Sequence, residues 1–182
     1  MDYTCAKSQA TVYSIRLPGL KGWAKVSIEE WNRGGSFQAI TDFGNYDYIW
    51  ASIGDRCLRK FLVGLDYGYF MTKAHPSHGM EFDAEASAKV IRAEIKEHVA
   101  EDPIRSQKCN EALDEIWDDL QHVDEQEFFH VIEDSDLFHW FYQGDYYSIT
   151  TCHRRQPQCD GFWKNIWPCL CEVWRNELEV ES

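Results

Sequence analysis

The chain has 182 residues, of which 44% are hydrophobic and 15% aromatic, and its formal net charge is −13. This length and apolar content predict a folded protein with a core of its own and exclude a disordered chain. The sequence holds no run of 18 apolar residues, and its first sixteen residues lack the hydrophobic region of a signal peptide, so we expect a cytoplasmic protein that neither enters nor binds a membrane. The seven cysteines are an odd number at irregular spacing, which indicates reduced thiols.

The negative charge is concentrated in one internal segment. Residues 81–145 hold nineteen acidic and five basic residues, a net charge of −14, whereas the rest of the chain holds twelve acidic and thirteen basic residues. Such a segment repels nucleic acid and anionic membranes and attracts a basic protein surface. Direct nucleic-acid binding is therefore not expected.

The first fifty residues favour β structure. Residues 10–17, 22–31 and 36–43 are rich in β-branched and aromatic side chains that partly alternate with polar ones. The segments between them, LPGLKG and NRGG, have the glycine, proline and asparagine content of turns. We predict an antiparallel meander of about three strands over residues 1–50.

Helical patterns follow the predicted meander. Apolar residues repeat at helical spacing in 58–65, in an alanine-rich segment at 83–102 that Pro103 ends, and in 111–123, with a shorter helical run at 126–136. After an irregular segment, residues 160–179 predict a last amphipathic helix in which Asp160 is the cap and Pro168 introduces a kink or a break. These patterns predict a single α+β domain over residues 1–182. Its N-terminal antiparallel sheet packs with four to five helices: 1–50 is the meander, 51–145 is helical and acidic from 81, and 146–182 holds the irregular segment and the C-terminal helix.

Residues 111–136 contain eleven carboxylates and neither lysine nor arginine. In the predicted helix 111–123, the apolar residues Leu113, Ile116, Trp117, Leu120 and Val123 fall on one side, so the carboxylates face solvent. Five carboxylates over 111–119 give about one charge per 2.4 Å of helix axis, a density comparable with the roughly one charge per 1.7 Å of duplex DNA. A solvated helix face is the default explanation of this pattern, a nucleic-acid mimic that binds a protein is the sharper alternative, and both stay open at this point.

Metal and catalytic chemistry has weaker support in the sequence. Cys169 and Cys171 lie two residues apart on a predicted helix and so point in different directions, and His75 and His78 flank a polar loop. We therefore predict neither a metal site, nor a cofactor, nor catalytic residues. The alternative from another class is a metal-dependent hydrolase that uses the acidic cluster with His122 or His130. A third possibility is a structural or dimerising accessory protein.

Two regions carry a resemblance to known proteins. The run GGSFQAITDFGNYDYIWASIG, the following FLVGLDYGYFMTK and the late FWKNIWP resemble small accessory proteins of bacteriophages and prophages of proteobacteria. The likeness covers about residues 10–75 and 160–178 and rests on aromatic and glycine patterning. It implies no activity and no cofactor, but it implies a phage context, in which accessory proteins often bind and inactivate a host machine such as a CRISPR or restriction complex.

Charge and resemblance together lead to one functional hypothesis. We expect a non-enzymatic, anti-CRISPR-like inhibitor in the cytoplasm of the host cell, whose acidic surface occupies the basic nucleic-acid-binding surface of a host defence complex. Its oligomeric state is open, and a homodimer is possible. The expected partner-binding residues are Glu111, Asp114, Glu115, Asp118, Asp119, Asp124, Glu125 and Glu127.

Overall fold

The computed structural model describes residues 2–180, and its contacts group the chain into two compact units. The first, here called the sheet unit, comprises Met1–Gly79 and Arg155–Ser182, and the second, the acidic unit, comprises Met80–Arg154. The sheet unit is therefore built from both ends of the chain, and the acidic unit is inserted between them in sequence. The single domain expected over residues 1–182 stays a prediction.

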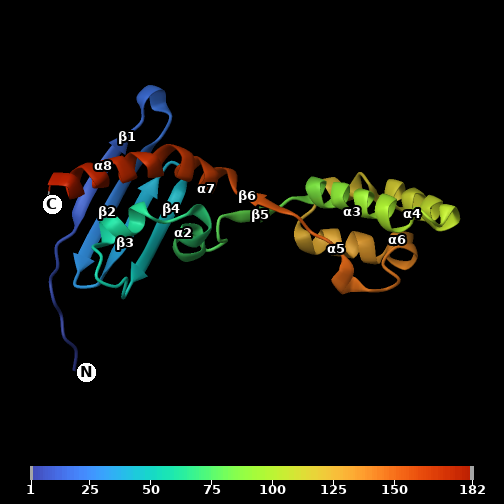
Figure 1. The fold of residues 1–182 in the computed structure, drawn as a ribbon, viewed down its shortest axis with the longest axis horizontal. Coiled ribbons are helices and arrows are strands. Elements are labelled where there is room, and N and C mark those ends of the chain that lie inside the picture. The colour runs from blue at the N-terminus through green and yellow to red at the C-terminus, as the bar shows by residue number, and fades with distance from the viewer. Residues whose placement is uncertain (1, 181–182) are drawn as a thin grey trace. The chain divides into compact units, whose positions relative to one another are not determined.

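The sheet unit is built on one antiparallel sheet in the order β1-β2-β3-β4 (Figure 1). A short 3-10 turn, η1 (Pro18–Leu20), separates the first two strands. The strands are β1 (Thr11–Arg16), β2 (Trp23–Trp31), β3 (Gly34–Thr41) and β4 (Gly44–Trp50). The α+β class and the antiparallel N-terminal sheet are confirmed, but the expected number of strands was too low, because residues 44–50 add a fourth strand beside β3.

One face of this sheet carries the core of the sheet unit, because side chains alternate between the two faces of a strand. Along β2, Ala24, Val26 and Ile28 are buried, whereas Trp23 and Lys25 are exposed. The same alternation continues in β3 and β4, and the second face stays open to solvent over much of its area.

Helices from both ends of the chain cover the buried face (Figure 1). They are α1 (Leu58–Val63), α2 (Tyr67–Ala74), α7 (Pro157–Gly161), the π-helical turn η4 (Phe162–Ile166) and α8 (Trp167–Val180). Aromatic rings dominate this core: the ring of Phe162 stacks on that of Tyr46 at 4.1 Å between centroids, and Phe70 lies 4.4 Å from Trp167. Burying such rings contributes about 2 kcal/mol each and joins the two separate segments of the sheet unit.

The C-terminal helix differs from the sequence prediction at its start. Asp160 does not cap it: it lies inside α7, and its carboxylate pairs with Lys164 and Arg155. The π-helical turn then precedes Pro168, and the amide of Trp167 donates to the carbonyl of Phe162, five residues back. Proline has no amide to donate and clashes with the preceding turn, so a wider turn at this place lets the helix continue into α8.

The acidic unit is mostly helical and has a core of its own. Its elements are β5 (Met80–Phe82), α3 (Ala84–His98), α4 (Pro103–Ile116), η2 (Asp119–Gln121), α5 (Glu125–Glu133), α6 (Asp136–Trp140), η3 (Tyr146–Ser148) and β6 (His153–Arg155), of which β5 pairs with β6. The core comprises mainly Ile91, Ile95, Leu113, Leu120, Phe128, Ile132 and Leu137, which are all fully buried. The described residues thus hold more helices than the four to five expected.

Aspartates begin the three longer helices of the acidic unit. Asp83, Asp102 and Asp124 each accept a hydrogen bond from the amide three residues ahead, which satisfies one of the free amides at each helix start. Pro103 was expected to end a helix, but it occupies the first turn of α4, where a missing amide costs nothing. The helix expected over 111–123 therefore begins at Pro103, ends at Ile116 and continues as the separate turn η2.

Candidate functional site

The carboxylates expected to bind a partner are divided between α4, η2 and the start of α5. In α4, Cys109, Ala112 and Leu113 are buried against the rest of the acidic unit, which directs Glu111, Asp114 and Glu115 to solvent. Asp118 and Asp119 are exposed at the turn after α4, Asp124 and Glu127 are exposed at the start of α5, and Glu125 beside them is partly buried. We call these eight residues the acidic surface.

Half of the acidic surface has polar contacts that contribute to the fold. Asp114 pairs with Arg92 of α3 at 2.5 Å, and Glu111 accepts a hydrogen bond from Gln107. Glu125 lies 3.4 Å from His153, and Asp124 caps α5. These contacts are structural, whatever else the four side chains do.

The other half has no such contact. Among residues 2–180, no ion pair or hydrogen bond involves the side chains of Glu115, Asp118, Asp119 or Glu127. Three of these four lie within five residues at the end of α4. Their charges are therefore available to a partner.

Arg92 of α3 forms an ion pair with the acidic surface. Besides its ion pair with Asp114, its guanidinium lies 3.8 Å from the centre of the Trp117 ring, which is partly buried. The arginine thus joins α3 to α4 through one carboxylate and one aromatic face. The positions are 22 and 25 residues apart, so no local pattern in the sequence indicates this contact.

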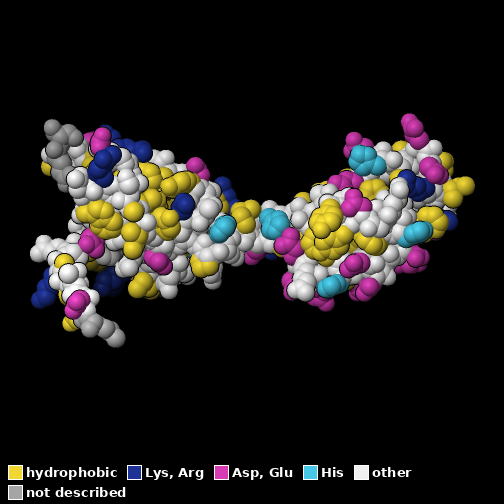
Figure 2. Space-filling view, turned by 90° about the horizontal axis from the view of Figure 1, so that it is seen from below, with side chains coloured by type: hydrophobic (Ala, Val, Ile, Leu, Met, Phe, Trp, Pro, Cys, Tyr) yellow, Lys and Arg dark blue, Asp and Glu magenta, His cyan; other side chains and the backbone are white. Residues whose placement is uncertain are grey.

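The division into two units shows how uneven the charge is. Residues 80–154 contain nineteen acidic and six basic residues, a net charge of −13, and the sheet unit contains twelve of each. The whole formal charge of the chain therefore resides in the acidic unit. Figure 2 shows carboxylates distributed over the visible face of this unit, with few lysine or arginine side chains between them.

Aromatic residues beside the acids divide between core and surface. Phe128 is fully buried, and Phe129 stacks on Tyr146 with 4.9 Å between ring centres. Tyr147 is 96% exposed, next to Asp145, whose carboxylate accepts its amide. Tyrosine is enriched at protein interfaces, so this exposed ring is available to a partner.

The histidines near this surface are the residues that a metal-dependent hydrolase would use. In the described part of the chain, no group of three or more histidine, cysteine or acidic side chains has the spacing to hold a metal ion. His122 is exposed, and Nδ1 of His130 lies 3.7 Å from Glu133. The hydrolase that would use these residues stays a prediction.

The cysteines and the remaining histidine pair have ordinary surroundings. Cys109, Cys159 and Cys171 are buried, and burial raises the pKa of the Cys171 thiol to about 11, which keeps it protonated. Nδ1 of His75 lies 2.9 Å from the Ser77 hydroxyl, and burial lowers the pKa of this histidine.

The sequence interpretation missed one feature of the sheet unit. The open face of the sheet has exposed tryptophans at both ends of β2, Trp23 and Trp31, and a hollow beside Trp23. The period-two alternation from Trp23 to Trp31 was a signal for this face, but an exposed tryptophan cannot be told from a core tryptophan by periodicity.

Comparisons with known proteins place the chain in a phage context. The model of a phage family, Phage_phiTE_072, matches residues 5–176. A search of curated proteins and a search of solved structures found no match. No helix within residues 2–180 combines the length and the apolar character needed to cross a membrane.

Proposed function

The chain belongs to this phage family, and from that premise we propose that it is a binding protein whose acidic unit occupies a basic, nucleic-acid-binding surface of a host protein. The observation that carries the proposal is the separation of charge: one compact unit has a net charge of −13, and the other is neutral. A need for solubility alone would be met by charge spread over both units. Concentrated charge instead produces a directional field that attracts a basic partner.

The unpaired acids at the end of α4 are the centre of the proposed contact. Glu115, Asp118 and Asp119 repel one another, because neighbours three and four residues apart lie on adjacent turns. A basic partner relieves this repulsion when it binds. The same surface would compete with DNA or RNA for that partner, because its charge density is comparable with that of a duplex.

The partner that we propose is a defence complex of the host, such as a CRISPR effector. Such complexes hold nucleic acid in positively charged channels, and a phage benefits when these channels are blocked. The protein would then act without turnover, and one chain would inactivate one complex. Phage membership and the acidic surface both support this finer proposal.

The test uses charge reversal at the free acids. In the triple variant E115K/D118K/D119K, three exposed and unpaired carboxylates become lysines. The matched control is D47K/E172K/E179K in the sheet unit, which also replaces three exposed acids that have no ion pair in the described part of the chain. Both variants change the net charge of the chain equally. Any difference in partner binding between them therefore reflects where on the chain the charges were reversed.

Tagged full-length chains are used to capture partners from a lysate of a host carrying a CRISPR system, and each captured complex is then assayed for binding of its own guide or target. We expect the natural chain and the control to retain the complex and block its nucleic acid, and the acidic-surface variant to lose both. Capture should also weaken as ionic strength rises, because the Debye length falls from about 10 Å at 0.1 M salt to about 3 Å at 1 M. Equal capture by both variants, or capture that leaves nucleic-acid binding intact, would contradict the proposal.

A further inference from the structure

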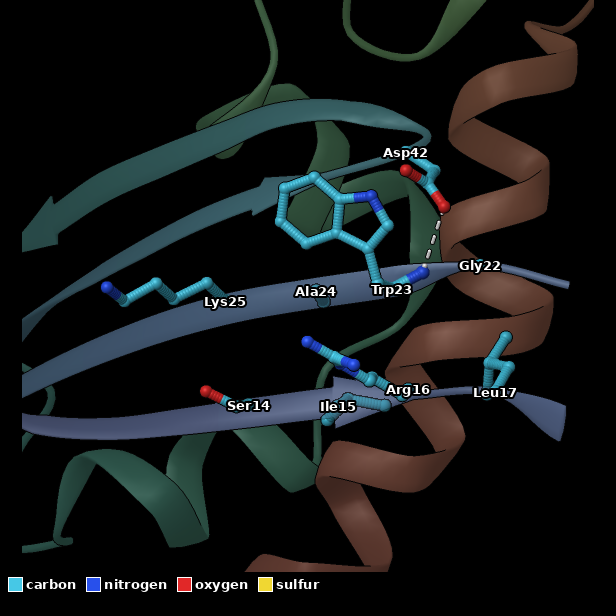
Figure 3. A pocket seen from close by; sticks show the side chains of 9 residues that line it. All are labelled: Ser14, Ile15, Arg16, Leu17, Gly22, Trp23, Ala24, Lys25 and Asp42. Atoms are coloured by element: carbon cyan, nitrogen blue, oxygen red, sulfur yellow. Dashed lines mark hydrogen bonds between the residues drawn. The ribbon is translucent and has the colours of Figure 1, made fainter. Parts of the chain in front are cut away.

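The open face of the sheet has a hollow of about 540 Å³ at the end where β1 and β2 meet (Figure 3). It is lined by Ser14, Ile15, Arg16, Leu17, Gly22, Trp23, Ala24, Lys25 and Asp42. This volume lies within the range of about 300–1,000 Å³ that is typical of small-molecule sites. The hollow belongs to the neutral sheet unit and shares no residue with the acidic surface.

The strand register brings four of these side chains together. Arg16 of β1 lies opposite Trp23 of β2, and Ser14 lies opposite Lys25. Trp23 and Lys25 are two residues apart on one strand and so point to the same face, away from the buried Ala24 between them. Directly opposite residues have Cβ atoms about 5 Å apart, so the two cations, the Ser14 hydroxyl and the Trp23 indole form one cluster on this face.

The two cations of this cluster, Arg16 and Lys25, have no ion-pair partner among the described residues. Asp42 is held at the other side of Trp23, where its Oδ2 accepts the Trp23 amide at 3.0 Å, while Oδ1 has no such bond (Figure 3). From β1 toward β3, the site therefore has two cations with a hydroxyl, then the Trp23 ring, which is 42% exposed, and then Oδ1 of Asp42.

We propose that this hollow binds a free nucleoside phosphate whose base carries an exocyclic amine. Arg16 and Lys25 would bind the phosphate, the arginine as a fork of donors and the lysine as a point charge, and Ser14 would donate a further hydrogen bond. The base would stack on the Trp23 ring, a contact that every base can make. Oδ1 of Asp42 would accept the amine, as acidic side chains accept the N4 amine of cytosine.

Binding is measured by calorimetry on the full-length chain with CMP and AMP as ligands. UMP serves as a matched ligand without an exocyclic amine, cytidine as a ligand without phosphate, and a cytosine pentanucleotide as a strand. We expect CMP and AMP to bind, UMP to bind more weakly, and cytidine to show no binding. A lack of heat for every mononucleotide at millimolar concentration overturns the proposal, and so does binding of the pentanucleotide alone.

Matched variants locate the site. Trp23→Ala should weaken CMP binding about tenfold or more through lost stacking, and Trp23→Phe should keep most of the affinity because a flat ring remains. Trp31→Ala is the control, since Trp31 lies on the same strand and is 41% exposed. Equal losses from Trp23→Ala and Trp31→Ala would contradict the assignment.

The polar residues give a second, independent readout. Arg16→Ala with Lys25→Ala should remove the preference for CMP over cytidine, and Asp42→Asn should remove the preference for CMP over UMP. Asparagine can still accept the Trp23 amide, so the turn stays intact while the negative charge is lost. Preferences that survive these changes would contradict the proposed orientation. The outcome does not depend on the acidic surface, so failure here leaves the proposed function untouched.

Discussion

Replacement of Arg92 by alanine tests how far the acidic unit depends on the arginine that joins α3 to the end of α4. The change removes the ion pair with Asp114 and the contact of the guanidinium with the Trp117 ring. An exposed ion pair contributes about 0.2–1 kcal/mol, and an exposed cation–π contact about 0.5–1 kcal/mol. We therefore expect Arg92→Ala to lower the free energy of unfolding of the acidic unit by about 1–2 kcal/mol.

The matched control is Lys89→Ala, one turn earlier on α3. Lys89 pairs with Glu85 on its own helix and is exposed, so its loss should cost about 0.5 kcal/mol or less. Hydrogen–deuterium exchange of peptides from α3 and α4 in the full-length chain reports the stability of the acidic unit separately from that of the sheet unit. This readout avoids the assumption that both units unfold in one transition.

Salt separates the two parts of the Arg92 effect. High ionic strength weakens the ion pair in the natural protein, so the difference between natural chain and variant should shrink. The part that persists in high salt measures the packing of the guanidinium on Trp117. Equal changes of hydrogen exchange in α3 and α4 for Arg92→Ala and Lys89→Ala would contradict the assigned role of Arg92.

Two further predictions concern the sheet unit. Gly35→Ala should lower the free energy of unfolding by about 1–3 kcal/mol in urea denaturation, because the new Cβ would lie 2.6 Å from both the Glu29 carbonyl oxygen and the Leu58 side chain. The control Gly64→Ala should not destabilise the unit, because its Cβ would lie 3.5 Å from the nearest atom. The Tyr67 hydroxyl donates a hydrogen bond to the Gly79 carbonyl at 2.6 Å. The pKa of this phenol is raised to about 12, mainly by burial. The unfolded chain ionises this phenol near pH 10, so its contribution to stability is complete below that pH and falls as the pH rises toward 12. Tyr67→Phe should therefore cost about 1 kcal/mol at about pH 8 and less at about pH 11, and a constant difference in urea midpoints would contradict the assigned pKa.

The sheet was predictable where alternation and apolar content agreed. In β2 the buried positions are Ala24, Val26 and Ile28, and the pattern is visible in the sequence. In β4 it is hidden, because Ile49 is exposed on the open face while Tyr46 is fully buried. The fourth strand was missed because apolar residues occur on both of its faces.

The prediction of helix boundaries was wrong at Pro103, because a proline can either end one helix or begin the next. Pro103 follows an aspartate, and this pair is a helix start when the aspartate caps and the proline takes the first turn. The same proline was interpreted as the end of the preceding helix. At Pro168 the sequence predicted a kink or a break of the helix, whereas the structure has a π-helical turn, Phe162–Ile166, just before α8, which no local pattern shows.

The division into two units lay beyond local reasoning for a different reason. The sheet unit is completed by a helix more than a hundred residues after its last strand, and composition does not tell which core an aromatic residue joins. Phe162 and Phe128 are both fully buried, yet they belong to different cores. The outward direction of most of the predicted acids, by contrast, follows directly from helical periodicity.

Some acids of the acidic unit stabilise the helix in which they lie, and others destabilise it, according to their position along the helix. Asp83, Asp102 and Asp124 lie at helix starts, where the helix dipole favours negative charge and each carboxylate caps an amide. Glu115 is in the last turn of α4, and Asp118 and Asp119 follow within three residues of its end, where the dipole disfavours negative charge and no basic residue is present in the last turn. Their placement costs stability, and no contact in the described part of the chain offsets that cost. The proposed contact is centred on these three exposed charges, which is why these positions, and not the acidic unit as a whole, are the sites to reverse.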